Sequence, residues 1–134
     1  MIDAHAALIY TMVIVSAADG NMTDAEMRTI GEIVQFLPMF RSFDQDALPK
    51  VAGECAELLN NEDGLDRALA AVKSALPPKL RETAYAVACD VASADERATP
   101  EKERILEILE DLFDLDTLTA AAIERAARAR HMRL

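Results

Sequence analysis

The segment SAADGNMTDAEM, residues 16–27, joins the end of an apolar run to the start of an acidic one. Asp19-Gly20 is typical of a turn, because Asp accepts hydrogen bonds from nearby backbone and Gly adopts left-handed dihedral angles readily. Thr23 with Glu26 three residues later forms the pattern of a capping box, in which each residue caps the start of a helix. The segment therefore predicts two helices joined by a short turn that carries carboxylates.

Breaks of the same kind divide the whole chain into about seven expected helices. The first is apolar on nearly every face, which places it at the centre of the fold. Strand-like alternation is nearly absent, so we expect one all-α domain, residues 1–134, in a compact bundle. The expected helices cover about 2–18, 24–37, 45–60, the stretch after NNEDG (60–64) to 76, 78–94, the stretch from Thr99 to 113, and the stretch from Asp114 or Asp116 into the arginine-rich end.

Composition limits the classes of function. Hydrophobic residues make up 51% of the chain, which indicates a packed core, and the formal net charge is −10. A nucleic-acid partner is not expected, because phosphate binding needs clustered Lys and Arg. The longest apolar stretch, residues 6–18, is shorter than the roughly 20 residues of a membrane span, so no transmembrane segment is expected. Two cysteines in apolar helical patterns indicate reduced thiols, and we expect a cytoplasmic protein.

A second segment, ASADERATPEKERI at residues 92–105, repeats the first at an offset of 76. In both, an apolar helix reaches an Asp, crosses four residues and meets a Thr cap before an acidic helix. The helical hairpin at the first turn is thus a candidate repeat of the hairpin at the second, although two unrelated capped turns would give the same pattern. If the two hairpins pack about a pseudo-two-fold axis, their turns lie close together.

A metal site is one interpretation of the two turns. Calcium and magnesium prefer several oxygen ligands, and four carboxylates brought together would favour a cation. The predicted ligands are Asp19, Glu26, Asp95 and Glu103, with the ion (calcium, magnesium or zinc) left open and Asp24 and Glu101 as possible additions. The alternative is purely structural, since the cap explains Glu26 and the turn explains Asp19.

A true EF-hand is excluded by the same residues. Counting Glu26 as the twelfth position of such a loop puts Val15 and Ala17 at its first and third positions, where side-chain oxygens are required. In the second segment Lys102 falls on the twelfth position, and the nearest acid is Glu103. Any metal site must therefore be shared between the two turns.

The helix ending AADG, the capped acidic helix, the later ASAD…TPEKERIL and the following LFDLD together resemble the TerB-like family, named for a bacterial tellurite-resistance protein. The resemblance spans nearly the whole chain. It implies an all-helical fold with an internally repeated core, a cytoplasmic stress-associated role and acids suspected of binding metal. The acidic positions it implies are Asp19-Gly20 with Glu26, and Asp95 with Glu103. The chain departs from the pattern at Glu96, where Gly is usual.

Three functions follow as hypotheses. The first is a non-enzymatic stress-associated module that binds a divalent metal through the two turns and docks protein partners, possible examples being membrane-associated stress complexes. The second is a protein-interaction module that works without metal. The third, less favoured, is an enzyme that uses paired carboxylates or Asp90, but the sequence contains no phosphate loop, GxSxG or CxxC motif. No catalytic residue is predicted, and the oligomeric state is left open.

Overall fold

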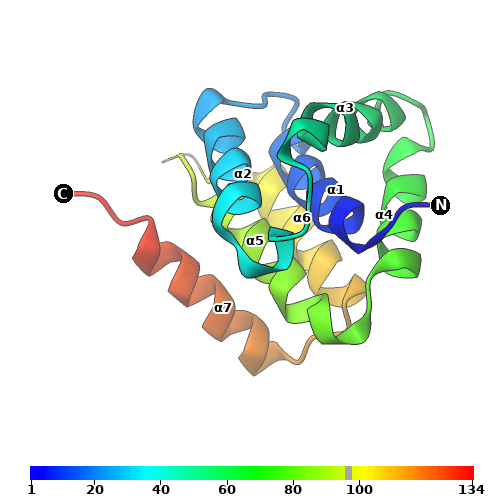
Figure 1. Ribbon diagram of the computed structural model, residues 1–134. Helices are drawn as coiled ribbons and strands as arrows, with labels where there is room; N and C mark the ends of the chain where they lie inside the picture. The colour runs from blue at the N-terminus through cyan, green and yellow to red at the C-terminus, as the bar shows by residue number, and fades with distance from the viewer. Residues whose placement is uncertain (96–97) are drawn as a thin grey trace.

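The computed structural model describes residues 1–95 and 98–134 (Figure 1). These residues form seven α-helices and three short 3-10 helices, and they contain no strand, so the all-α prediction is confirmed. The α-helices are α1 (Ala4–Ala17), α2 (Asp24–Phe36), α3 (Leu48–Leu59), α4 (Gly64–Ala75), α5 (Arg81–Ala92), α6 (Pro100–Leu112) and α7 (Thr117–Arg130).

Helix α1 is the centre of the bundle. Its residues 6–16 are all buried, as expected for a helix that is apolar on every side. It packs against α3, α4 and α5, and also contacts α2 and α6. Figure 1 shows α1 enclosed by these helices, whereas α7 lies outside them and packs mainly on α5. The core is consequently built around one helix that has no polar face.

The two predicted caps are present in the structure. The Thr23 hydroxyl accepts a hydrogen bond from the Glu26 backbone N–H, and the Glu26 carboxylate accepts one from the Thr23 N–H, which completes the capping box. The Thr99 hydroxyl accepts a hydrogen bond from the Lys102 backbone N–H at the start of α6, without a reciprocal bond, and Pro100 is at the first helical position. Gly20 has φ +78°, a left-handed conformation that favours glycine. Local sequence therefore determines where α2 and α6 begin.

Several helix boundaries differ from the prediction near prolines. Pro38 and Pro78 each open a short 3-10 helix, Pro38–Phe40 and Pro78–Leu80, and α5 starts only at Arg81. A third 3-10 helix, Gln45–Ala47, precedes α3. Proline lacks the N–H that continues an α-helix but is accepted in the first turn of a tighter one. The chain uses these turns to change direction between α-helices.

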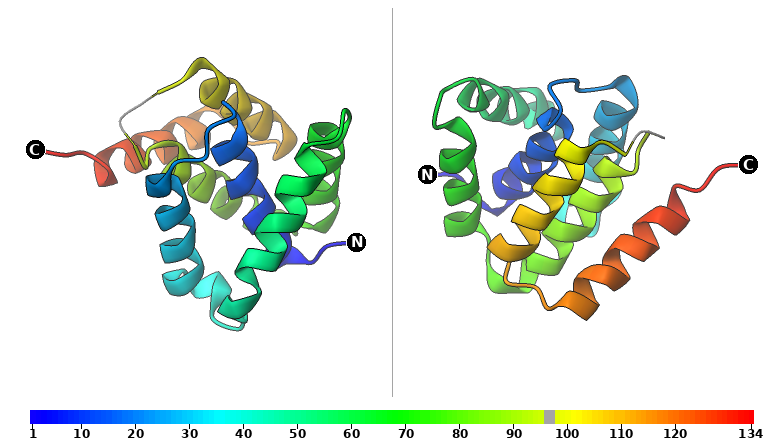
Figure 2. Two further views of the ribbon diagram at one scale, coloured as in Figure 1. Left: turned by 90° about the horizontal axis from the view of Figure 1, so that it is seen from above. Right: turned by 180° about the vertical axis from the view of Figure 1, so that it is seen from behind.

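The hairpin α1–α2 packs directly on the hairpin α5–α6, through contacts of α5 with α1 and α2 and of α6 with α1. Figure 2 shows the turn after α1 and the segment after α5 at the same end of the bundle. The proposed duplication of the two hairpins stays a prediction. Glu96, where the family pattern has Gly, lies outside the described residues.

Within the described part of the chain, no helix is both long enough and apolar enough to cross a membrane.

Candidate functional site

A buried lysine lies where the two acidic turns meet. The Lys102 side chain is 2% exposed, and its ammonium forms an ion pair with Glu26, which is fully buried. The Nζ atom is also 3.7 Å from an Asp19 carboxylate oxygen and 3.8 Å from one of Asp95. We call these four residues the ionic cluster. Three of the four predicted metal ligands thus surround one positive charge supplied by the chain itself.

Each carboxylate of the ionic cluster is also held by a neighbouring group. Oε1 of Glu26 accepts hydrogen bonds from the Ser16 hydroxyl at 3.1 Å and from the Thr23 N–H at 2.9 Å. This leaves Oε2 of Glu26 to face Lys102. The turn also fixes Asp19, whose Oδ1 accepts a hydrogen bond from the Asn21 N–H at 3.0 Å. The cluster is therefore tied to the end of α1, to the following turn and to the start of α2.

Thr23 connects the two turns. Its hydroxyl accepts from the Glu26 N–H and donates to Oδ2 of Asp95 at 3.2 Å. Asp95 belongs to the segment after α5, 72 residues away along the chain. One hydroxyl thus serves a helix cap and a long-range bond at once, which fixes the first turn against the second.

Glu103, the fourth predicted ligand, lies elsewhere. It is exposed on α6 and faces a groove between α6 and α7, which Lys102 and Asp95 also border. Successive residues of a helix point about 100° apart, so Lys102 and Glu103 cannot share one direction. Lys102, not Glu103, is the residue of this helix that reaches the other turn.

The residues of the ionic cluster do not fit a divalent cation as they lie. Such an ion requires oxygen ligands around an open position, whereas here an ammonium projects among the oxygens. No group of three or more His, Cys, Asp or Glu residues able to hold a metal is found among residues 1–95 and 98–134. The metal site therefore stays a prediction.

Ion pairing also explains the presence of Asp90 in the apolar pattern of α5. Its Oδ1 accepts from Arg130 Nη2 at 2.7 Å and lies 3.3 Å from Nε2 of His131. The Asp90 side chain is 19% exposed, so the pair lies at the edge of the interface between α5 and α7. An acid in the apolar pattern of α5 thus holds the end of α7, and it gives no separate indication of acid–base chemistry.

The model of the family described as tellurite resistance protein TerB matches residues 5–129 of this chain. The chain belongs to the TerB family. The match covers all seven helices except the first residue of α1 and the last residue of α7, and it therefore includes the ionic cluster and both turns. No significant match is found among curated proteins or among solved structures.

The resemblance seen in the sequence is thus confirmed for the TerB family, which is generally not a catalytic one. Sequence reasoning missed the role of Lys102, although a signal for it was present. At the offset of 76 that aligns the turns, Lys102 falls on Glu26, so the two equivalent positions carry opposite charges. Opposite charges at positions expected to approach each other predict an ion pair.

Proposed function

We propose that this TerB-family chain is a non-enzymatic, cytoplasmic module of a tellurite-resistance-like stress response that docks protein partners without needing a metal ion. The single observation that supports it is the buried ammonium of Lys102 among Glu26, Asp19 and Asp95. The positive charge that joins the two turns belongs to the polypeptide. The arrangement of the hairpins should then be the same with and without divalent ions.

The same cluster argues for a structural use of its carboxylates. A general acid or base must be within reach of a substrate proton, yet Glu26 is fully buried and engaged by three groups: Ser16, Thr23 and Lys102. The carboxylate of Glu26 is therefore already engaged by groups inside the fold. What the protein offers to other molecules is its surface, and a protein-docking module is the function that this arrangement supports best.

Metal binding is the second candidate, and the charge balance of the cluster favours it. Three carboxylates and one ammonium leave a formal charge of −2, and Asp19 and Asp95 are each partly exposed. A divalent cation could be recruited only if the Lys102 side chain withdrew. Such withdrawal would break a buried ion pair, which is strongly unfavourable.

Thermal melting with and without ions separates the two candidates. A ligand that binds only the folded state raises the melting temperature. For the wild-type protein we expect the same melting temperature, within about 1 °C, in chelator and in calcium, magnesium, manganese or zinc. The proposal fails if one ion raises the melting temperature and the paired change Asp19→Asn, Asp95→Asn abolishes the increase.

A matched control removes the same number of charges elsewhere. Asp66→Asn with Asp111→Asn neutralises two exposed acids that lie outside the ionic cluster. An ion effect that persists in this control and disappears in the Asp19, Asp95 variant would place the ion at the turns. An effect lost equally in both would indicate general screening of an acidic protein, and the proposal of metal independence would stand.

A further inference from the structure

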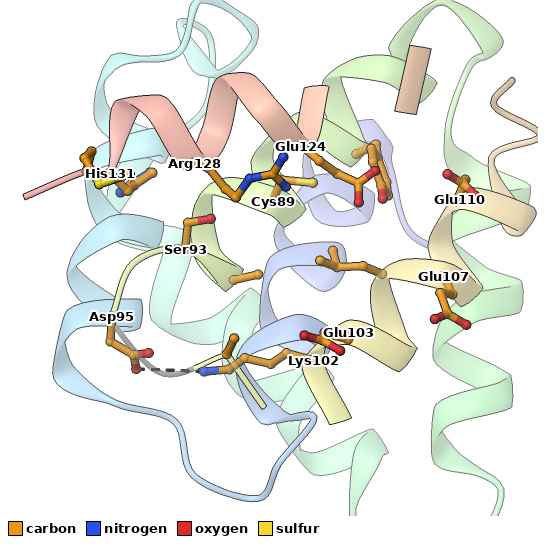
Figure 3. Close-up of a pocket in the computed structure, with 15 residues that line it drawn as sticks. Cys89, Ser93, Asp95, Lys102, Glu103, Glu107, Glu110, Glu124, Arg128 and His131 are labelled. Atoms are coloured by element: carbon orange, nitrogen blue, oxygen red, sulfur yellow. Dashed lines mark ion pairs between the residues drawn. The ribbon is translucent and has the colours of Figure 1, made fainter. Parts of the chain in front are cut away.

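A groove of about 600 Å³ lies between α6 and α7, with α5 beneath it (Figure 3). Its volume is within the roughly 300–1,000 Å³ typical of binding sites. Tyr85, Cys89 and Ala92 of α5 line the floor, and Leu106 and Met132 add apolar surface at the sides. In the right-hand view of Figure 2, α6 and α7 are joined by a short turn and diverge from it. We call this the α6/α7 groove.

Glutamates line the groove on the α6 side and at its end. Glu103, Glu107 and Glu110 are spaced four and three residues apart, which places them on one face of the helix. Glu124 enters from α7. Glu107 pairs with Arg104 at 3.1 Å, but both side chains are about 70% exposed. A pair so exposed is weak, so it leaves Glu107 available to another cation.

The other three glutamates have no partner among residues 1–95 and 98–134. No hydrogen bond or ion pair joins the carboxylates of Glu103, Glu110 or Glu124 to any residue in the described part of the chain. Glu124 also lies near the floor. Burial first, and then the Glu124 charge, raises the pKa of the Cys89 thiol to about 12. The groove therefore combines an apolar floor with negative charges that lack an internal partner.

The basic groups of the groove are largely engaged elsewhere. His131 is held by Asp90, and Lys102 belongs to the ionic cluster with Asp95. Arg128, the other cationic residue among the described lining residues, comes from the α7 side. Three of the four glutamates among the described lining residues lie on α6, so an occupant should have a positive face toward α6.

These features select one kind of occupant. Nucleic acid and anionic lipid would be repelled by the glutamates and by the net charge of −10. A second copy carries the same net charge. An amphipathic helix with a Lys or Arg stripe can pair with the α6 glutamates and set its apolar face on the floor. Glu103 to Glu110 span about 10 Å along α6, which corresponds to two turns of such a helix.

We propose that the α6/α7 groove binds a basic amphipathic helix of a partner protein. This names the partner class for the docking role proposed above and rests on that role. The carboxylates that carry it are not members of the ionic cluster, although Lys102 and Asp95 of that cluster also border the groove. The charges provide selection against acidic helices, and the apolar floor provides contact area.

The test uses a fluorescein-labelled 18-residue peptide with lysines along one face and leucine and alanine along the other. Its partner peptide carries glutamates in place of the lysines. Fluorescence anisotropy at low salt should show binding of the lysine peptide and not of the glutamate peptide. The triple variant Glu103→Gln, Glu110→Gln, Glu124→Gln should bind the lysine peptide roughly tenfold more weakly.

A matched control variant tests whether the position of the removed charges matters, and not only their number. Glu32→Gln, Glu54→Gln, Glu57→Gln removes three exposed acids from α2 and α3 and leaves the groove intact. We expect its affinity to stay within about twofold of wild type, because distant charges are screened. Ser93→Trp, which places a large side chain among the lining residues, should also abolish binding. This variant still tests the groove if the triple variant fails to fold.

Several outcomes would overturn the proposal. Equal losses in the two triple variants would show attraction to net charge alone, and equal binding of both peptides would show that the glutamates select nothing. A dimer of the chain in sedimentation that the groove triple variant abolishes would assign the groove to a second copy. None of these results bears on melting in divalent ions, so failure here is distinguishable from failure of metal independence.

Discussion

Glu26 and Lys102 stand 76 residues apart, the same offset that aligns the two turns, and their side chains pair in the interior of the protein. Positions that align at this offset thus carry opposite charges and meet where the two hairpins pack. Two carboxylates at these positions would repel each other and require an external cation. Lys102 provides that cation within the chain.

The change Lys102→Met should destabilise the protein strongly. It leaves Glu26 buried beside two further carboxylates without a positive charge, and breaking a buried pair in this way costs about 3–5 kcal/mol. Urea unfolding followed by circular dichroism measures the loss. Arg104→Met, two residues further along α6 and exposed, is the control and should change stability by about 0.5 kcal/mol or less.

The double variant Lys102→Met, Glu26→Gln extends this prediction. Removing both charges relieves the unpaired carboxylate, so the double variant should be more stable than Lys102→Met alone. Additive losses would mean that the two side chains do not interact, and the central role assigned to Lys102 would then be wrong.

Thr23 and Thr99 provide a comparison between two similar caps. Each hydroxyl accepts a backbone N–H at the start of a helix, but Thr23 also donates to Asp95. Thr99→Ala should cost about 1 kcal/mol, the usual value of a cap. Thr23→Ala should cost roughly 1.5–3 kcal/mol more, because it also removes a hydrogen bond to a charged group. Thermal or urea unfolding of the two variants gives the difference.

Thr23→Ser is the matched control for this comparison, since it keeps the hydroxyl and should retain most of the stability. If Thr23→Ala and Thr99→Ala prove equally destabilising, the bond from Thr23 to Asp95 contributes nothing and the two turns are held by other contacts.

The fold could be predicted from the sequence because its signals are local. Thr23 with Glu26, and Thr99 with Pro100, place the starts of α2 and α6 at the observed residues. The apolar character of α1 likewise predicts its central position. Prolines were less informative, since Pro78 opens a 3-10 helix and α5 begins three residues later. A proline restricts its own dihedral angle but does not decide between the two helix types.

The site could be predicted only in part, because its centre depends on long-range packing. Asp19, Glu26 and Asp95 were selected as acids at turns, and the structure places them around one ammonium. A search of the sequence for oxygen ligands favours Glu103, whereas the residue of α6 that reaches the other turn is Lys102. The direction in which a residue of α6 points depends on how α6 packs, and spacing within a short turn does not determine it.

Asp90 should control the order of the last turn of α7. Its carboxylate binds Arg130 and approaches His131, and α7 otherwise packs mainly on α5. Asp90→Asn should reduce global stability by about 1 kcal/mol or less, since the pair is partly exposed. Amide hydrogen exchange of residues 128–131 should nevertheless increase. Unchanged exchange in that segment would show that packing alone holds the end of α7.

The two cysteines should make the protein sensitive to alkali. Burial raises the pKa of Cys55 and of Cys89 from 9.0 to about 12 in the folded protein. A thiol with a raised pKa stabilises the folded state fully below its unfolded pKa, and this stabilisation is lost as the pH rises toward the folded pKa. Between about pH 9 and pH 12 the folded state therefore holds protons that the unfolded state has released, and the free energy of unfolding should fall.

Urea unfolding from pH 8 to pH 11 measures this loss, with the variant Cys55→Ala, Cys89→Ala as the control. Burial, and then the neighbouring Cys55 and Cys89, also raise the pKa of Tyr10 and of Tyr85, so the difference between the two profiles reports the thiols together with their effect on the two tyrosines. The wild-type stability should decline more steeply above pH 9 than that of the variant. Parallel profiles would mean that the thiols ionise as readily in the folded protein as in the unfolded chain, contrary to the burial of Cys55 in α3 and Cys89 in α5.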